Sequence, residues 1–223
     1  MEKKFVIFTL RKEKNMKYPR AKTGLVLLLI GVLLVVLGTL FASLLYISSS
    51  QTLAKVGKIL VVVGGLVELA GLIVCGTTKS HYFRRALIVL VISVVLALVG
   101  VILTYINPTS MDAVKIITVV NLLLAIASGV LNVIMILSII KGCGEVSSST
   151  LVKKLASFVI TLLVIAFVAE AAIALIETIS YFAPVGPNIL TVVKVISWVQ
   201  LVAALGYGAT YLVLLFSAAK TVE

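Results

Sequence analysis

The stretch Lys58-Ile59-Leu60-Val61-Val62-Val63 opens a long apolar run, and close versions of it return twice later in the chain. These versions are Lys115–Val120 and Lys194–Val199. Each version follows a tyrosine and a short turn, and each tyrosine ends another long apolar run that begins next to basic residues. The chain therefore consists of three copies of one pattern: a basic start, an apolar run, a tyrosine, a turn, a lysine and a second apolar run.

The composition is typical of a protein whose outer solvent is lipid. Of the 223 residues, 62% are hydrophobic and 12% are charged, and the mean hydropathy is +1.28. A water-soluble domain of average composition contains about 25% charged residues. The uncharged runs also reach the roughly 18 residues that a membrane span requires. We therefore expect an integral membrane protein.

The apolar runs predict helices, because each backbone donor in hydrocarbon must find its acceptor within the same segment. They are too long and too continuous for the strands of a membrane barrel. The predicted fold is all-α, an integral membrane bundle of six transmembrane helices arranged as three antiparallel hairpins. The expected spans are 24–47, 53–76, 86–106, 111–140, 151–182 and 189–219. They form a domain over residues 24–219, preceded by a basic cytoplasmic or interfacial arm (1–23) and followed by a short cytoplasmic tail (220–223).

The distribution of lysine and arginine predicts the orientation. Fifteen of the 19 lie in the arm, in the connections 77–85 and 141–154, or at Lys220. Loops rich in basic residues stay in the cytoplasm, so we expect both termini there and the protein in the plasma membrane. The net charge of +11 is explained by anionic lipids at the arm. We expect no nucleic acid partner, because the arm offers no aromatic platform for bases.

Three carboxyl groups inside the expected spans require an explanation, since a charge at the bilayer centre costs about 2.5–3.5 kcal/mol. Glu177 and Lys194 are expected at similar depths on adjacent helices, where they would form a structural ion pair. Glu68 and Glu170 are expected close to the midplane, with no basic residue at that depth. They are a candidate ion or proton site. The alternative is that each is protonated and joins two helices through a hydrogen bond.

The repeated lysines, Lys58, Lys115 and Lys194, are expected near the outer surface, where they would form an outer basic tier. One interpretation is a vestibule that attracts anions. The other is that the lysines extend to lipid headgroups, as lysines at helix ends commonly do.

Residues with catalytic or metal-binding potential are few. The only histidine, His81, is expected in a loop, so we expect no histidine-based metal site, no cofactor and no enzyme activity. Cys75 and Cys143 are expected at the cytoplasmic ends of two helices. They are candidates for palmitoylation, and we expect them to be free, reduced thiols.

Small residues four positions apart predict close helix packing. The pairs are Gly38 with Ala42, Ala125 with Gly129, and Ala204 with Gly208, and the dipeptide Gly64-Gly65 adds a further point of close approach. Together with the short loops, they favour a non-enzymatic subunit or scaffold of a larger membrane assembly. Its partners would be other membrane protein subunits or further copies of itself. The alternative is a small channel or transporter of protons, cations or a small solute that uses Glu68 and Glu170.

Overall fold

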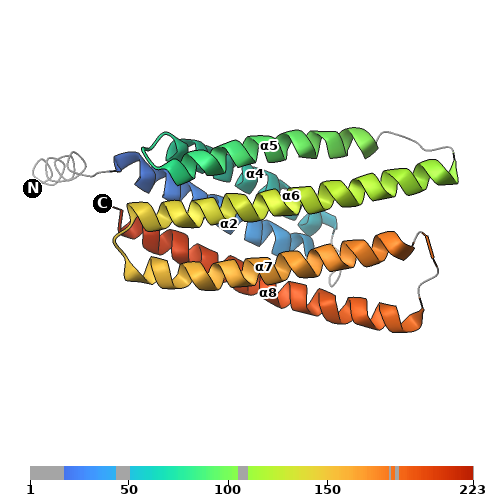
Figure 1. Ribbon diagram of the computed structural model, residues 1–223. Coiled ribbons are helices and arrows are strands. Elements are labelled where there is room, and N and C mark those ends of the chain that lie inside the picture. Colours follow the sequence, from blue (N-terminus) through green and yellow to red (C-terminus); the bar gives the residue numbers. More distant parts are fainter. Residues whose placement is uncertain (1–17, 44–50, 105–109, 181, 184–185, 223) are drawn as a thin grey trace, which may run out of the picture. The chain divides into compact units, whose positions relative to one another are not determined.

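The computed structural model describes residues 18–43, 51–104, 110–180, 182–183 and 186–222, and these residues are helical apart from short connections. The helices of this part are α2 (Pro19–Ser43), α4 (Gln51–Gly76), α5 (His81–Thr104), α6 (Met111–Val146), α7 (Thr150–Ser180) and α8 (Pro187–Lys220) (Figure 1). All six are long and apolar enough to cross a bilayer. The all-helical class and the presence of six helices long and apolar enough to span a membrane are thereby confirmed.

Each helix extends past the predicted apolar run at one end or both, although α7 ends at Ser180, two residues before its predicted end at 182. α5 begins at His81, so the predicted loop at 77–85 is wrong in its second half, and His81 starts a helix. α6 continues to Val146, six residues past the predicted end at 140. The physical reason is that apolar runs mark the hydrocarbon layer, whereas a helix can continue through the headgroup layer, where charged side chains are solvated. Residues 1–17 and the three tyrosines at 46, 105 and 181 lie outside the described residues.

The chain divides into two compact units. Unit 1 comprises residues 1–87, 138–156 and 208–223, so it holds α2, α4 and one end of each later helix. Unit 2 comprises residues 88–137 and 157–207, which are the remaining parts of α5 to α8.

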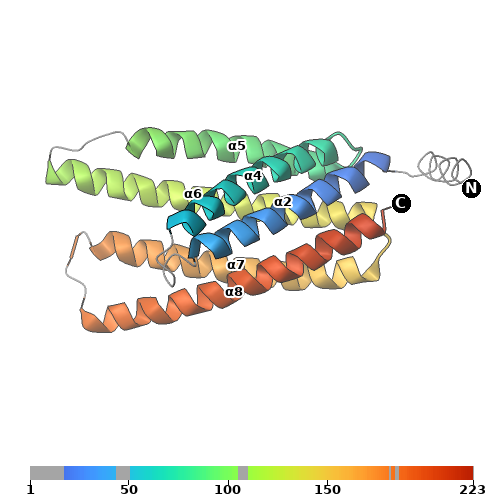
Figure 2. The same ribbon diagram turned by 180° about the vertical axis from the view of Figure 1, so that it is seen from behind.

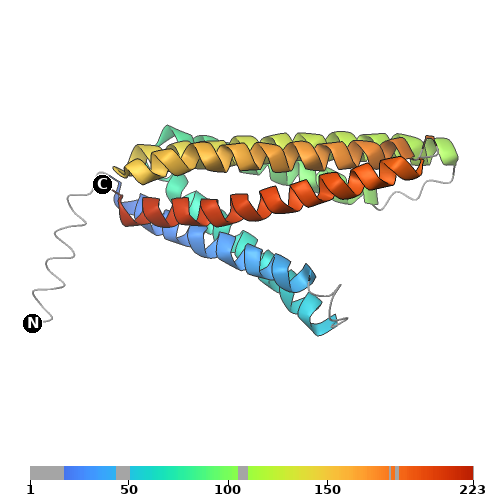
Figure 3. The ribbon, with the colours of Figure 1, turned by 90° about the horizontal axis from the view of Figure 1, so that it is seen from below.

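In unit 1, α2 packs against α4 through two rows of glycines that repeat every seven residues. Figures 2 and 3 show the two helices side by side. The rows are Gly24, Gly31 and Gly38 in α2, and Gly57, Gly64 and Gly71 in α4. The first glycine of one row faces the last of the other, so the two helices are antiparallel. A seven-residue period keeps the same helix face turned toward the partner over several turns.

The contact between α2 and α4 is backbone to backbone. A Cβ on Gly31 would lie 2.9 Å from the carbonyl oxygen of Gly64 and 2.6 Å from the amide nitrogen of Glu68. A Cβ on Gly64 would lie 2.8 Å from the carbonyl oxygen of Gly31 and 2.8 Å from the amide nitrogen of Val35. Backbone atoms cannot move aside as a side chain can, so these positions accept only glycine. Close packing of this kind is what holds helices together in lipid.

Unit 1 also has a buried core where α5, α6, α7 and α8 contribute their ends. Phe83 of α5 is fully buried, and its ring lies against Gly142 of α6, where an added Cβ would be 2.7 Å from the ring. Val152 of α7 and the pair Leu214 and Leu215 of α8 are also fully buried. These large apolar side chains form a buried core at this end of the unit.

In unit 2, the segments of α5, α6, α7 and α8 lie next to one another in chain order (Figures 1 and 2). Gly129 of α6 receives the ring of Phe167 from α7, and no room remains there for a side chain. Gly206 of α8 lies opposite Leu162 of α7, whose Cδ1 is 3.1 Å from an added Cβ. Small residues therefore set the helix contacts in this unit as well. Of the predicted small residues, Gly38 and Gly64 lie in the α2–α4 contact, whereas Gly65 faces open space.

The neighbouring glycines of α4 provide a matched test of the α2–α4 contact. We expect Gly64→Val to lower the free energy of unfolding in detergent by about 1–3 kcal/mol more than Gly65→Val, because the added side chain at 64 meets backbone. The two variants change helix propensity equally, so the difference isolates the contact. The measurement is unfolding by titration with a denaturing detergent. Equal losses in the two variants would show that α2 and α4 are not held by this contact.

Candidate functional site

Glu68 lies in the α2–α4 contact of unit 1. Its side chain is half-buried, and its Cγ is 2.5 Å from the position that a Cβ on Gly31 would occupy. The Glu68 side chain therefore lies across the backbone of α2 where Gly31 leaves room for it. Among the described residues, no side chain or backbone group hydrogen-bonds to its carboxyl group.

Glu170 has a different environment in unit 2, because its side chain is exposed. It lies seven residues before Glu177, which is exposed as well, so the two carboxyl groups point to the same side of α7. Val159 and Leu163 share that side, eleven and seven residues before Glu170, and both are buried. One side of α7 thus changes along its length from a packed apolar surface to an exposed row with two carboxyl groups.

The opposite side of α7 carries large apolar side chains. Val168 and Leu175 are 57% and 48% exposed, and they lie on the side away from Glu170. Hydrocarbon suits these side chains and does not suit a carboxyl group. Glu170 is therefore exposed on a polar side of the helix rather than on the side that matches lipid.

α6 carries a similar polar row in unit 2. Asn121 and Asn132 are eleven residues apart, about three turns, so they lie on one side of the helix. Both are exposed. Ile136 and Ile139 continue that side toward the end of the helix and are buried. As in α7, the packed end of the side is apolar and the exposed part is polar.

The helix bounds place both candidate carboxyl groups away from the helix centres. The midpoint of α4 (Gln51–Gly76) falls between residues 63 and 64, and Glu68 lies about 7 Å further toward Gly76. The midpoint of α7 (Thr150–Ser180) is residue 165, and Glu170 lies about 7 Å further toward Ser180. The depth expected from the sequence, close to the bilayer midplane for both groups, stays a prediction.

Among the described residues, the structure does not bring together the predicted ion pair of Glu177 and Lys194, and the three lysines of the predicted basic tier are not in one unit. Glu177 and Lys194 are both exposed, and no ion pair joins them in the described part of the chain, so the pairing stays a prediction. Lys115 is half-buried, and its Nζ lies 5.9 Å from the centre of the Phe182 ring, within the range of a cation–π interaction. Lys58 is exposed on α4 in unit 1, so the three lysines do not belong to one unit.

Cys75 and Cys143 are free thiols, and both are fully buried in unit 1. The Sγ of Cys75 lies 3.9 Å from the carbonyl oxygen of Ala21, to which it donates, and it fills the space beside Gly24. Buried thiols of this kind pack as small apolar groups. In this structure neither thiol is presented to an acylating enzyme, which agrees with the prediction of free thiols.

A hydrogen-bonded cluster at the end of unit 1 was not found from the sequence. Ser80, just before α5, donates from its Oγ to Oε2 of Glu145 near the end of α6, at 2.5 Å. Ser147 shares a hydrogen bond of 2.5 Å with the hydroxyl of Thr221, and the amide of Ser148 donates to the Thr221 carbonyl at 3.4 Å. These bonds tie the ends of three helices together. Ser147 and Thr221 are 74 residues apart, so spacing alone gave no signal for their contact.

The glycine rows were also missed, although the sequence contained their signal. A spacing of four residues includes Gly38, but the spacing that matters is seven, and it occurs twice in each of two consecutive helices. Hydroxyl groups within the spans, by contrast, do not mark a site. Those of Thr39, Ser93, Thr118, Thr161, Thr178 and Ser197 each donate to the carbonyl four residues earlier in the same helix.

Within the described residues, no group of three or more His, Cys, Asp or Glu side chains could hold a metal ion. Comparison of the chain with known protein families, with curated proteins and with solved structures finds no match. The six apolar helices indicate a membrane protein.

Proposed function

We propose that the protein is a non-enzymatic subunit or scaffold of a larger membrane protein assembly, with its helices arranged as three antiparallel hairpins across the bilayer. The observation that carries this proposal is the exposed position of Glu170 within α7. Asn121 and Asn132 are exposed in the same way on α6. Polar groups in hydrocarbon are costly and normally face protein or water. A partner helix that covers these rows would supply the hydrogen bonds they need.

The two sides of α7 support this assignment. Lipid would contact the apolar side, where Val168 and Leu175 are exposed, and the partner would contact the side of Glu170. Helices in membranes associate through small residues and interhelical hydrogen bonds. Ala166 and Ala174 lie one turn on either side of Glu170, so a partner backbone could approach the carboxyl group closely. The partner would be another membrane protein subunit or a second copy of this chain.

The position of Glu68 favours the same function over ion transport. The Glu68 side chain packs across α2 at Gly31, so its place is explained by helix packing within the chain. Glu68 belongs to unit 1 and Glu170 to unit 2, and the two side chains differ in exposure, since Glu68 is half-buried and Glu170 is exposed.

A substitution on each side of α7 tests the proposed assembly. We expect Glu170→Ala to shift the protein, solubilised in mild detergent, from a larger complex to a single chain, with about 5- to 30-fold weaker association from the lost interhelical hydrogen bond. Val168→Ala, on the apolar side, should leave the complex intact. The measurement is mass by light scattering after size exclusion. A single chain in the parent protein, or dissociation by both variants, would contradict the proposal.

A channel or transporter of protons, cations or a small solute is the second candidate. The observation that favours it is that the exposed polar rows of α6 and α7 belong to one unit, so they could line a hydrated path. If so, Glu170→Gln should reduce ion flux into reconstituted vesicles at least about tenfold, because the neutral amide no longer exchanges a proton or attracts a cation. Flux that is unchanged in this variant, or absent from the parent protein, would exclude this candidate.

For the topology, we propose that both termini lie in the cytoplasm and that the protein resides in the plasma membrane. The support is the excess of lysine and arginine on the side of the termini. An epitope tag at either terminus should become accessible to antibody only after the cells are permeabilised. A tag placed at position 186, between α7 and α8, should be accessible on intact cells. Staining of a terminal tag on intact cells would show that the topology is the reverse of the proposed one.

A further inference from the structure

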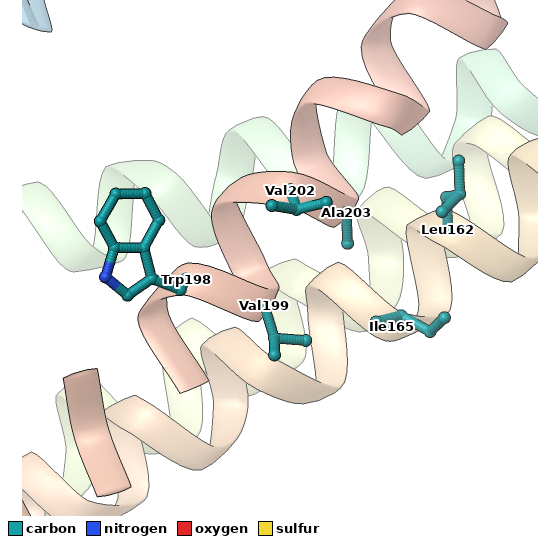
Figure 4. Close-up of a pocket in the computed structure, with 6 residues that line it drawn as sticks. All are labelled: Leu162, Ile165, Trp198, Val199, Val202 and Ala203. Atoms are coloured by element: carbon teal, nitrogen blue, oxygen red, sulfur yellow. The ribbon is translucent and has the colours of Figure 1, made fainter. Parts of the chain in front are cut away.

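An apolar groove lies between α7 and α8 in unit 2 (Figure 4). Its volume is about 390 Å³, within the range of binding sites for small molecules. The lining residues are Leu162 and Ile165 of α7 and Trp198, Val199, Val202 and Ala203 of α8. Five of the six side chains are aliphatic, and the sixth is an indole. The groove therefore offers hydrocarbon contact and nothing that would bind a polar solute.

The local packing explains why the groove exists. α7 and α8 are in close contact where Leu162 lies against Gly206. Ala203, one turn earlier in α8, is too small to fill the space beside α7, although its own side chain is buried. Trp198, a further turn away, is 68% exposed and leaves the groove open (Figure 4). An open space thus begins directly beside a tight contact.

The length of α8 places the groove relative to the headgroups. Its 34 residues make a helix about 51 Å long, whereas the hydrocarbon layer is about 30 Å thick. A centred helix therefore extends about 10 Å, or about seven residues, beyond the hydrocarbon at each end. This places Lys194 at the boundary with the headgroups and Trp198 about 6 Å deeper. Both side chains are exposed.

Lys194, Trp198 and Val202 follow one another at intervals of four residues, so they form a row along α8 from the headgroup boundary to the groove. The row presents a cation, an indole and an aliphatic side chain in that order. An anionic phospholipid presents its own parts in the same order: a phosphate, the glycerol region and an acyl chain. Basic residues at the membrane surface each contribute to the binding of such headgroups.

From this juxtaposition we infer that the α7–α8 groove is a binding site for an anionic glycerophospholipid of the leaflet that contains the α7–α8 turn. The acyl chain occupies the groove between Ile165 and Val199. The phosphate pairs with the ammonium group of Lys194. The indole of Trp198 covers the part of the acyl chain that is next to the glycerol region. This site is independent of the proposed assembly through Glu170, which lies on another side of α7.

The site contains its own reporter, because Trp198 is the only tryptophan of the chain. The protein is reconstituted in phosphatidylcholine vesicles that contain a small fraction of a lipid with brominated acyl chains. This lipid is phosphatidylglycerol in one preparation and phosphatidylcholine in the other. Bromine quenches tryptophan fluorescence on contact. We expect the apparent affinity of the site to be about fivefold higher for the brominated phosphatidylglycerol than for the brominated phosphatidylcholine. This is the difference that one lysine near the membrane surface contributes to the binding of an anionic lipid. High salt should reduce this preference.

Variants separate the groove from ordinary lipid contact. Lys194→Gln should make the two brominated lipids quench equally. The control is Lys115→Gln, because Lys115 lies on α6 with its ammonium group over the ring of Phe182; this variant should leave the preference unchanged. Val199→Phe fills the groove and should lower quenching by both lipids. Equal quenching in the parent protein would mean ordinary lipid contact, and no quenching by either lipid would mean that protein covers the groove. Either result overturns the inference, as does an equal effect of the two lysine variants.

Discussion

Helices surrounded by hydrocarbon gain nothing by hiding apolar side chains from their solvent, so they are held together by how closely their atoms approach. The α2–α4 contact shows this constraint most clearly. Glycines at intervals of seven let the two backbones touch, and backbone atoms occupy the space where a side chain would begin. The same rule operates at Gly129, under the ring of Phe167, and at Gly142, under the ring of Phe83. Size at the contact, rather than hydrophobicity, is what the sequence specifies there.

Much of the fold could be predicted because the bilayer reduces the alternatives. Apolar runs of sufficient length must be helices, and their number follows from counting them. The ends were less predictable, since hydropathy marks the hydrocarbon layer and the helix continues past it. His81 and the residues after Ile140 were assigned to connections for that reason, although both belong to helices.

The positions of the charged side chains were harder to predict, because depth and facing direction are separate quantities. Sequence gives an approximate depth by counting residues, and it treated Glu68 and Glu170 as equivalent. The structure separates them by facing direction: Glu68 turns toward a neighbouring helix at Gly31, and Glu170 is exposed. For Glu68 the sequence contained a signal, because Gly64 and Gly71 lie one turn before and after it and place it on the face that packs against α2. The facing direction of Glu170 has no such signal in the sequence. It depends on which helix packs on which side, as does the contact between Ser147 and Thr221.

α7 connects these points within a single helix. Val159, Leu163, Glu170 and Glu177 lie along one side, and the side chains change from apolar to acidic where burial ends. If lipid covered the exposed part, apolar side chains such as leucine or valine would be more favourable there than carboxyl groups. Such side chains are found at Val168 and Leu175 on the other side. The acidic side chains instead indicate that this surface meets polar groups, from protein or from water. The same helix contributes Ile165 to a groove without polar groups, so its two surfaces require two different neighbours.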